Sequence, residues 1–234
     1  RESVTIAVPL SGLDMNKVVP GSDTGAIAEN VSAKLVADIA GADICIDIHA
    51  SNIFIREVPQ VRISRANSDA LLKYAKLLNT DFVWVHNSNA VGEGSLSDTL
   101  NKNGVPTLVV EMGVGQRITK SYCTQLLTGI FNLMSEMGMW TGETDTVSHP
   151  MVSTDGSVRV IHAEQSGIFI PSAEHNMWVA KGTVIGEIVT PINGTVEQEI
   201  IAPADGLIFS LREYPIVYEG SVIARILSMG EEEI

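Results

Sequence analysis

Hydrophobic and polar residues alternate in two patterns in the first part of this 234-residue chain, one typical of helices and one typical of strands. Apolar residues spaced three or four positions apart predict helices over residues 26–40, 67–79, 96–103 and 119–139. Short, β-branched apolar runs predict buried strands over residues 43–51, 82–86 and 107–113. Helices that alternate with strands are typical of an α/β fold with a mostly parallel or mixed sheet flanked by helices.

The pattern changes near residue 140. Residues 141–157 are rich in Thr, Ser, Gly, Asp and Pro, which is typical of a linker. Short alternating runs follow and predict strands over residues 158–163, 167–170, 184–189, 197–201, 206–211 and 222–227. We therefore expect an α/β domain over residues 1–145 and a small all-β barrel or sandwich over residues 155–230.

Two predicted strands of the first domain end in residues that can support chemistry. His49 ends one strand and Glu111 ends another. Ligands of open α/β sheets bind outside the carboxyl ends of the strands, so both side chains could face one pocket. An imidazole and a carboxylate there suggest a metal ligand and a general base. A lone histidine is more often structural, but Asp47 lies on the same side of the strand and could orient a ligand.

A second polar group lies in the irregular segment before Pro20. Asn16 and Lys17 suit a carboxylate or carbonyl oxygen of a substrate, although by itself an ordinary turn explains them better. The remaining histidines give weaker evidence of a functional role. His86 ends a predicted strand and could line the same pocket, and His175 is expected to be exposed in a loop. We assign a metal role to neither.

Composition narrows the class of partner. The formal net charge of −13 disfavours nucleic acid and anionic membranes as partners. The two cysteines, Cys45 and Cys123, form no disulfide framework, which fits a cytoplasmic protein. Phosphate-binding glycine loops and a G-x-S-x-G nucleophile motif are missing from the sequence. Whether the chain forms a homo-oligomer stays open.

Taken together, the motifs resemble the succinylglutamate desuccinylase/aspartoacylase family of zinc-dependent deacylases, relatives of the zinc carboxypeptidases. The resemblance rests on motifs that occur in the family's order: Asp14-Met15-Asn16-Lys17-Val18-Val19-Pro20-Gly21, Asp47-Ile48-His49, Gly104-Val105-Pro106 and Val109-Val110-Glu111-Met112-Gly113. The carboxy-terminal strands resemble the small β domain of bacterial members, which is similar to biotinyl/lipoyl-type folds.

The resemblance implies a zinc amidohydrolase that removes the acyl group from a small N-acyl amino acid or a related amide. His49 would be a zinc ligand oriented by Asp47, and Glu111 would activate water and later protonate the leaving amine. Asn16 and Lys17 would hold a substrate carboxylate. Lys17 stands where the family usually has Arg, and its point charge lacks the bidentate fork.

The family's other zinc ligands, a His-x-x-Glu upstream of the Asp-Asn-Arg segment, have no counterpart in this sequence. One ligand cannot hold a catalytic zinc, so we expect the others on a segment upstream of Arg1. The alternative is a non-catalytic relative that binds a small ligand or a partner. A biotin or lipoyl carrier is disfavoured because the candidate hairpin, residues 190–195, contains no Lys.

Overall fold

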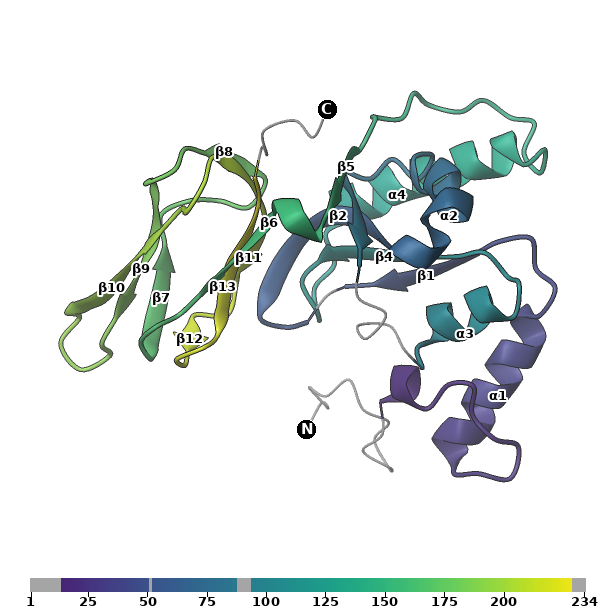
Figure 1. Ribbon diagram of the computed structural model, residues 1–234, viewed down its shortest axis with the longest axis horizontal. Helices are drawn as coiled ribbons and strands as arrows, with labels where there is room; N and C mark the ends of the chain where they lie inside the picture. The colour runs from purple at the N-terminus through teal and green to yellow at the C-terminus, as the bar shows by residue number, and fades with distance from the viewer. Residues whose placement is uncertain (1–13, 51, 88–93, 229–234) are drawn as a thin grey trace.

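A mixed sheet flanked by helices continues into an all-β region at the carboxy-terminal side of the molecule (Figure 1). The computed structural model describes residues 14–50, 52–87 and 94–228. The first thirteen residues of the irregular segment predicted over residues 1–20 lie outside these ranges, as does Ser51. Among the described helices, none has the length and apolar character needed to cross a membrane.

Every helix and strand predicted from the sequence pattern is present. The helices are α1 (Ile27–Ile39), α2 (Ser68–Ala75), α3 (Leu96–Lys102) and α4 (Lys120–Glu136), and short 3-10 turns are η1 (Met15–Lys17), η2 (Arg65–Asn67) and η3 (Asp155–Ser157). The strands are β1 (Cys45–His49), β2 (Ile55–Ser64), β3 (Phe82–His86), β4 (Thr107–Gly113), β5 (Met151–Thr154), β6 (Val158–His162), β7 (Gly167–Pro171), β8 (Met177–Val179), β9 (Val184–Val189), β10 (Val196–Ile201), β11 (Gly206–Arg212), β12 (Ile216–Val217) and β13 (Val222–Ser228).

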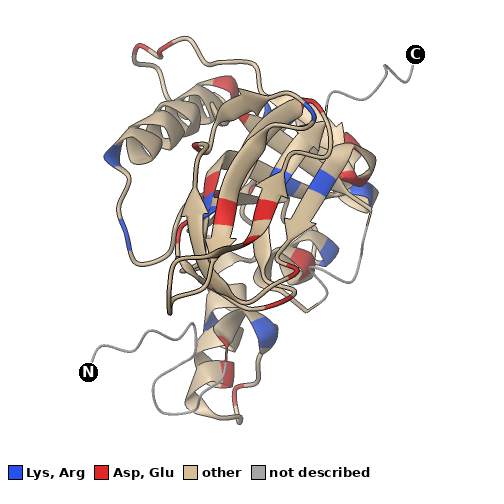
Figure 2. Ribbon diagram, turned by 90° about the vertical axis from the view of Figure 1, so that its left-hand side faces the viewer, with Lys and Arg blue, Asp and Glu red and all other residues tan. Residues whose placement is uncertain are grey.

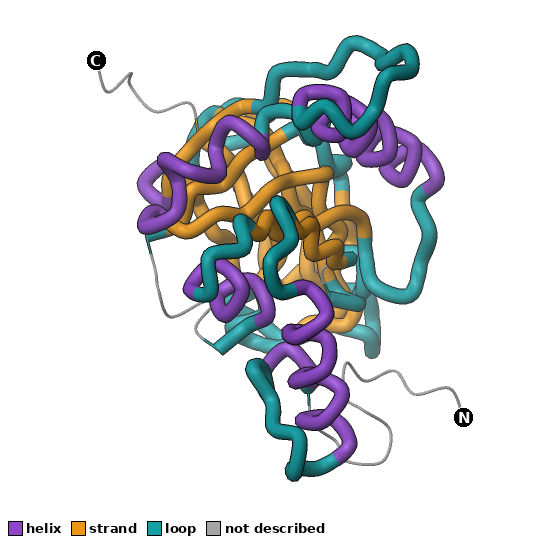
Figure 3. The backbone as a smooth tube through the Cα atoms, turned by 90° about the vertical axis from the view of Figure 1, so that its right-hand side faces the viewer, coloured by secondary structure: helices purple, strands orange, loops and turns teal. Residues whose placement is uncertain are grey.

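The larger sheet has nine strands, and its main path runs β1-β4-β2-β11-β13-β6. Pairings between β1 and β4, β2 and β3, and β3 and β5 are parallel, whereas β2 pairs with β4 in the antiparallel sense. Helices lie on both sides of the α/β part of the sheet (Figure 3). The apolar side chains of one face pack against α2 and α4 in a single core: Val61, Ile63, Leu71, Ala75, Leu78, Val83, Val85, Leu108, Val110, Leu126 and Leu133.

Strand β2 is the central element of the sheet, and the sequence pattern does not predict it. It pairs with β4, β3 and β11, so it connects the α/β part with the β strands that follow. Pro59 lies inside it and argues against a central strand, because proline cannot donate a ladder hydrogen bond. The pairing with β4 shifts register between Glu57 and Gln60, so Pro59 lies at an irregularity that tolerates it.

Residues 158–228, here called the β module, form two layers. One layer is the four-stranded sheet β10-β9-β7-β12, and the other consists of β11, β13, β6 and β8. Both contribute to one buried core that includes Phe169, Ile188 and Ile226. The predicted sandwich is therefore present, but its second layer is continuous with the α/β sheet because β11 pairs with β2. A domain that is separate from the α/β part stays a prediction.

The predicted linker is only partly irregular. Strand β5 lies within residues 141–157 and pairs with β3, which extends the α/β sheet by one strand. Asp155 in η3 accepts hydrogen bonds from the Trp84 indole N–H and the Asn87 backbone N–H, at 2.8 and 2.7 Å. The segment before the β module is thus attached to the α/β part. Acidic and basic positions are interspersed on the face that carries the β module (Figure 2).

Helix α1 forms where its apolar spacing predicts it, but that spacing does not face the core. Ile27, Val31 and Leu35 are 66%, 46% and 40% exposed, while Ala28 and Ser32 are buried. The large apolar residues therefore lie on the outer side of the helix.

We expect Gly129→Ala in α4 to destabilise the fold. A Cβ at Gly129 would lie 2.0 Å from the carbonyl oxygen of Leu78, in the backbone that follows α2, so the two elements would have to separate. Overpacking of this kind costs roughly 1–3 kcal/mol, which urea denaturation would detect as a lower free energy of unfolding. The control is Cys123→Ala at an exposed position of the same helix. Wild-type stability of Gly129→Ala would contradict this packing.

Candidate active site

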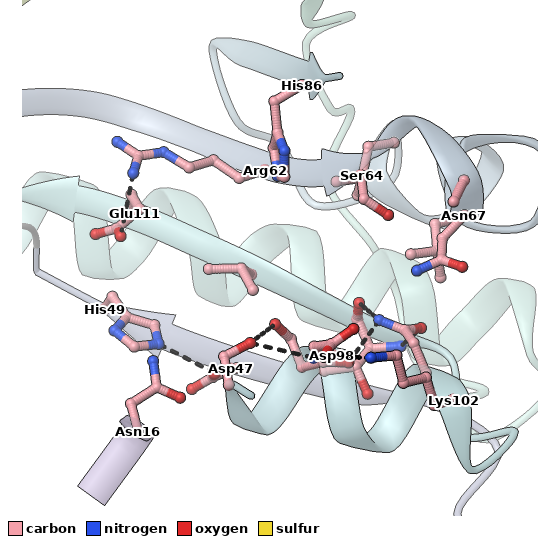
Figure 4. Close-up of a pocket in the computed structure, with 18 residues that line it drawn as sticks. Asn16, Asp47, His49, Arg62, Ser64, Asn67, His86, Asp98, Lys102 and Glu111 are labelled. Atoms are coloured by element: carbon pink, nitrogen blue, oxygen red, sulfur yellow. Dashed lines mark hydrogen bonds and ion pairs between the residues drawn. The ribbon is translucent and has the colours of Figure 1, made fainter. Parts of the chain in front are cut away.

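The register between β1 and β4 brings the two predicted catalytic side chains together. The strands are parallel neighbours, and His49 lies opposite Glu111. Both side chains line a pocket of about 450 Å³ (Figure 4). This volume lies in the range of small-molecule sites. The structure thus places His49 and Glu111 in one pocket.

Asp47 lies beside the His49 ring. Its Oδ2 atom lies 3.0 Å from Nε2 of His49. The hydrogen bond to Asp47 raises the pKa of His49, burial opposes the rise, and the charges of Asp47 and Glu111 add to it. Nδ1 makes no hydrogen bond within the described ranges, so it is the ring nitrogen that can bind a ligand or a metal.

The carboxylate of Glu111 lies beside an arginine that the sequence patterns miss. Nη1 of Arg62, on β2, lies 3.5 Å from Oε1 of Glu111, and the two side chains are 23% and 13% exposed. Arg62 also lines the pocket. The polar alternation of Gln60, Arg62 and Ser64 could have indicated a strand with a functional face. The proline in the same run conceals that signal.

The structure places Asn16 in the pocket and Lys17 outside it. Asn16 lies near His49 (Figure 4), and its Oδ1 accepts a hydrogen bond of 2.9 Å from the backbone N–H of Leu96. This bond leaves the amide NH₂ group of Asn16 as the end that can donate to a ligand. Lys17 is exposed and does not line the pocket, so its proposed contact with a substrate carboxylate has no support from this geometry.

Helix α3 forms another wall of the pocket. Asn101 joins it to β4, because its side chain accepts from the Thr107 N–H at 3.0 Å and donates to the Thr107 carbonyl at 3.1 Å. Asp98 and Lys102 of this helix also line the pocket, and they form an ion pair of 2.9 Å with each other (Figure 4). His86, at the end of β3, also lines the pocket, as its position in the sequence suggested.

His175 does not occupy an exposed loop position as expected. It is half-buried, and its Nε2 lies 2.6 Å from the hydroxyl oxygen of Tyr122 on α4. Burial lowers the pKa of His175, and the charge of Arg56 acts in the same direction. The residue lies outside the catalytic pocket and connects the β module with the start of α4.

The described residues do not form a complete metal site. His49 offers one imidazole with a carboxylate behind it, the arrangement found for many metal-binding histidines. Within residues 14–50, 52–87 and 94–228, no group of three or more His, Cys, Asp or Glu could hold a metal ion. A catalytic zinc requires about three protein ligands, so these residues by themselves do not complete a zinc site.

Comparison with known proteins identifies the family. The model of the succinylglutamate desuccinylase/aspartoacylase catalytic domain matches residues 8–137. The chain belongs to this family, as the motifs around Asn16, His49 and Glu111 indicated. A comparison with curated proteins found no match.

Solved structures share the fold at low sequence identity. The product-bound ectoine utilization protein EutE (DoeB) from Ruegeria pomeroyi matches with a TM-score of 0.81 and 19% identity, over 94% of this chain and 69% of that chain. A succinylglutamate desuccinylase/aspartoacylase from Rhodobacter sphaeroides matches with a TM-score of 0.80 and 19% identity, over 96% and 70% of the two chains. A succinylglutamate desuccinylase from Silicibacter sp. TM1040 matches with a TM-score of 0.82 and 18% identity, over 94% and 68%.

We expect the pKa of His49 to lie above its ordinary value of 6.5 and to fall in Asp47→Asn, because the bond to Asp47 is the main cause of the rise. A raised folded-state pKa stabilises the fold below the unfolded value and loses that effect as pH rises through the folded value. NMR titration of the imidazole would measure the change. Asp38→Asn, at an exposed position of α1, is the control. An unchanged midpoint in Asp47→Asn would contradict the hydrogen bond.

Proposed function

We propose that this chain carries the active site of a zinc-dependent hydrolase that cleaves the acyl-amide bond of a small N-acyl amino acid or a related compound. The observation that carries the proposal is the pair His49 and Glu111, opposite each other on neighbouring strands and facing one pocket. Membership of a family of deacylases supports the same chemistry.

Glu111 is the proposed general base and acid. Its carboxylate is largely shielded from solvent and lines the pocket, where it would contact the attacking water molecule. It would take a proton from that water and later give it to the amine that leaves. Arg62 restrains the carboxylate from the neighbouring strand, so that its oxygens keep one orientation toward the pocket.

His49 is the proposed zinc ligand from this part of the chain. Asp47 holds the Nε2 side of the ring, and Nδ1 is therefore the atom for the metal. When bound, zinc polarises a carbonyl and lowers the pKa of water. The ligands that complete the site would come from residues outside the described ranges.

Asn16 is the proposed contact for a polar oxygen of the substrate. The backbone of Leu96 fixes its side-chain oxygen, so its NH₂ group can donate to a carboxylate or a carbonyl in the pocket. The names of the family suggest acetylated and succinylated acidic amino acids as first probes. We do not assign Lys17 to this site, because it is exposed away from the pocket.

The alternative is a non-catalytic relative that binds a small ligand or a partner. One observation favours it, namely that the described residues include no group of three or more His, Cys, Asp or Glu that could hold a metal ion. Zinc content separates the two candidates, because a non-catalytic protein has no need of a metal next to Glu111.

We expect Glu111→Gln to lower kcat by about 10²–10⁴-fold, the usual contribution of a general base, while zinc stays bound. Turnover of N-acetyl-L-aspartate and N-succinyl-L-glutamate would measure activity, and elemental analysis would measure zinc. His49→Ala should lose zinc and activity together. The matched control is Glu136→Gln, which removes an exposed carboxylate at the end of α4.

Either of two outcomes would overturn the proposal. Wild-type turnover in Glu111→Gln would exclude the assigned base. A full-length wild-type protein that contains no zinc and hydrolyses neither probe would favour the non-catalytic alternative.

A further inference from the structure

A chain of ion pairs, centred on a fully buried carboxylate, connects the β module with the pocket. At its centre is Glu57 on β2, whose side chain is 0% exposed. Nη2 of Arg62 donates to both oxygens of Glu57, at 2.9 and 2.7 Å, and Nη1 of Arg225 donates to Oε1 at 2.6 Å. Arg62 continues to Glu111 through its other terminal nitrogen. The order of contacts is therefore Arg225, Glu57, Arg62 and Glu111.

Arg225 belongs to a part of the molecule remote from the pocket in sequence. It lies on β13 of the β module, 168 residues from Glu57, and does not line the pocket. Nη1 of Arg225 also donates to the Ser210 hydroxyl at 3.3 Å, so the guanidinium is held on β11 as well. Burial lowers the pKa of Arg225, and the charge of Glu57 counteracts this. Each charge thus offsets the free energy that burial of the other would cost without a partner.

The position of Arg62 depends on this pairing. Nη2 of its guanidinium donates to Glu57, and Nη1 forms the ion pair with Glu111. The Trp84 ring lies 5.4 Å below it, and the indole is fixed in turn by Asp155. If Arg225 were removed, the buried Glu57 would keep only one cationic partner among the contacts described here. Arg62 would then be drawn toward Glu57 and away from Glu111.

We propose that Arg225 is a positioning residue of the candidate active site: by sharing Glu57 with Arg62, it holds the Arg62 guanidinium against the carboxylate of Glu111. The β module therefore contributes to the pocket through contacts rather than by lining it. The catalytic consequence rests on the proposed function, whereas the placement of Arg62 does not.

A purely structural role makes a different prediction. If Arg225 only joins the two parts of the sheet, its replacement lowers the stability of the protein but leaves Arg62 and the pocket unchanged in the molecules that stay folded. If Arg225 positions Arg62, the replacement changes the environment of the Arg62 guanidinium. The two roles are separated by a measurement on Arg62 itself.

The first test uses NMR signals of arginine side chains in the full chain. The Arg62 Nε–H signal is assigned by its loss in Arg62→Lys, and it is then compared in wild type, Arg225→Met and Arg225→Lys. We expect a shifted and broadened signal in Arg225→Met and a smaller change in Arg225→Lys, which keeps the positive charge. Arg159→Met, at an exposed arginine of the β module, is the matched control and should leave the signal in place.

The second test measures hydrolysis of N-acetyl-L-aspartate and N-succinyl-L-glutamate. We expect Arg225→Met to lower kcat by about 10–100-fold, as changes behind a catalytic group typically do, with KM altered much less. Arg225→Lys should recover part of kcat, and Arg159→Met should match the wild type. Loss of kcat that Lys does not rescue would contradict positioning by charge.

An unchanged Arg62 signal in folded Arg225→Met would overturn the proposal, whatever the activity. A changed signal in a protein whose wild type hydrolyses neither probe would support the positioning and count against the proposed function. If Arg225→Met does not fold, the comparison of Arg225→Lys with wild type decides the outcome by the same signal.

Discussion

The burial of one carboxylate constrains how the two parts of this molecule meet. Glu57 has no exposure to solvent, and a charge in that environment must be paired and hydrogen-bonded to be tolerated. Its partners come from opposite sides, Arg62 from its own strand and Arg225 from the β module. The pairing occurs where β2 meets β11, the point at which the α/β sheet becomes a layer of the β module. Charge compensation and sheet continuity therefore act at the same place.

The pocket is assembled from strands rather than from one continuous motif. β1 supplies His49 with Asp47 behind it, β4 supplies Glu111, and β2 supplies Arg62. The parallel register of β1 and β4 fixes the first pair, because a shift of one residue would turn one side chain to the opposite face. The antiparallel strand β2 then places a cation beside the carboxylate. Rigid strands hold such groups more accurately than loops do.

Much of this arrangement could be predicted from the sequence because strand ends in an α/β fold converge. His49 and Glu111 end apolar runs, and the general rule for ligand sites places both at one edge of the sheet. The rule predicts where along each strand a ligand site lies, but it does not predict which strands are neighbours in the sheet. The placement of His49 opposite Glu111 depends on β1 and β4 being neighbours, although β2, α2, β3 and α3 lie between them in the sequence.

Other features could not be predicted, for identifiable physical reasons. Pro59 argues against a central strand, so β2 and its Arg62 are not predicted. A proline is tolerated there only because the strand is irregular at that point, and the sequence does not indicate this irregularity. The apolar spacing of α1 predicts the helix correctly, but periodicity cannot tell which side another element will cover. His175 was expected to be exposed because its loop is polar, whereas its burial arises from Tyr122, a contact across the fold.

Contacts across the fold also explain why the role of the β module cannot be predicted from its own sequence. Its strands contain no residue that lines the catalytic pocket, and its motifs resemble a carrier fold. Its effect on the pocket passes through Arg225, an arginine in an apolar strand that would ordinarily be taken for a surface residue. The carboxylate that makes this arginine significant lies 168 residues away. A contact of that separation forms only after the whole sheet has assembled, so the orientation of Glu111 is a property of the complete fold rather than of the α/β part by itself.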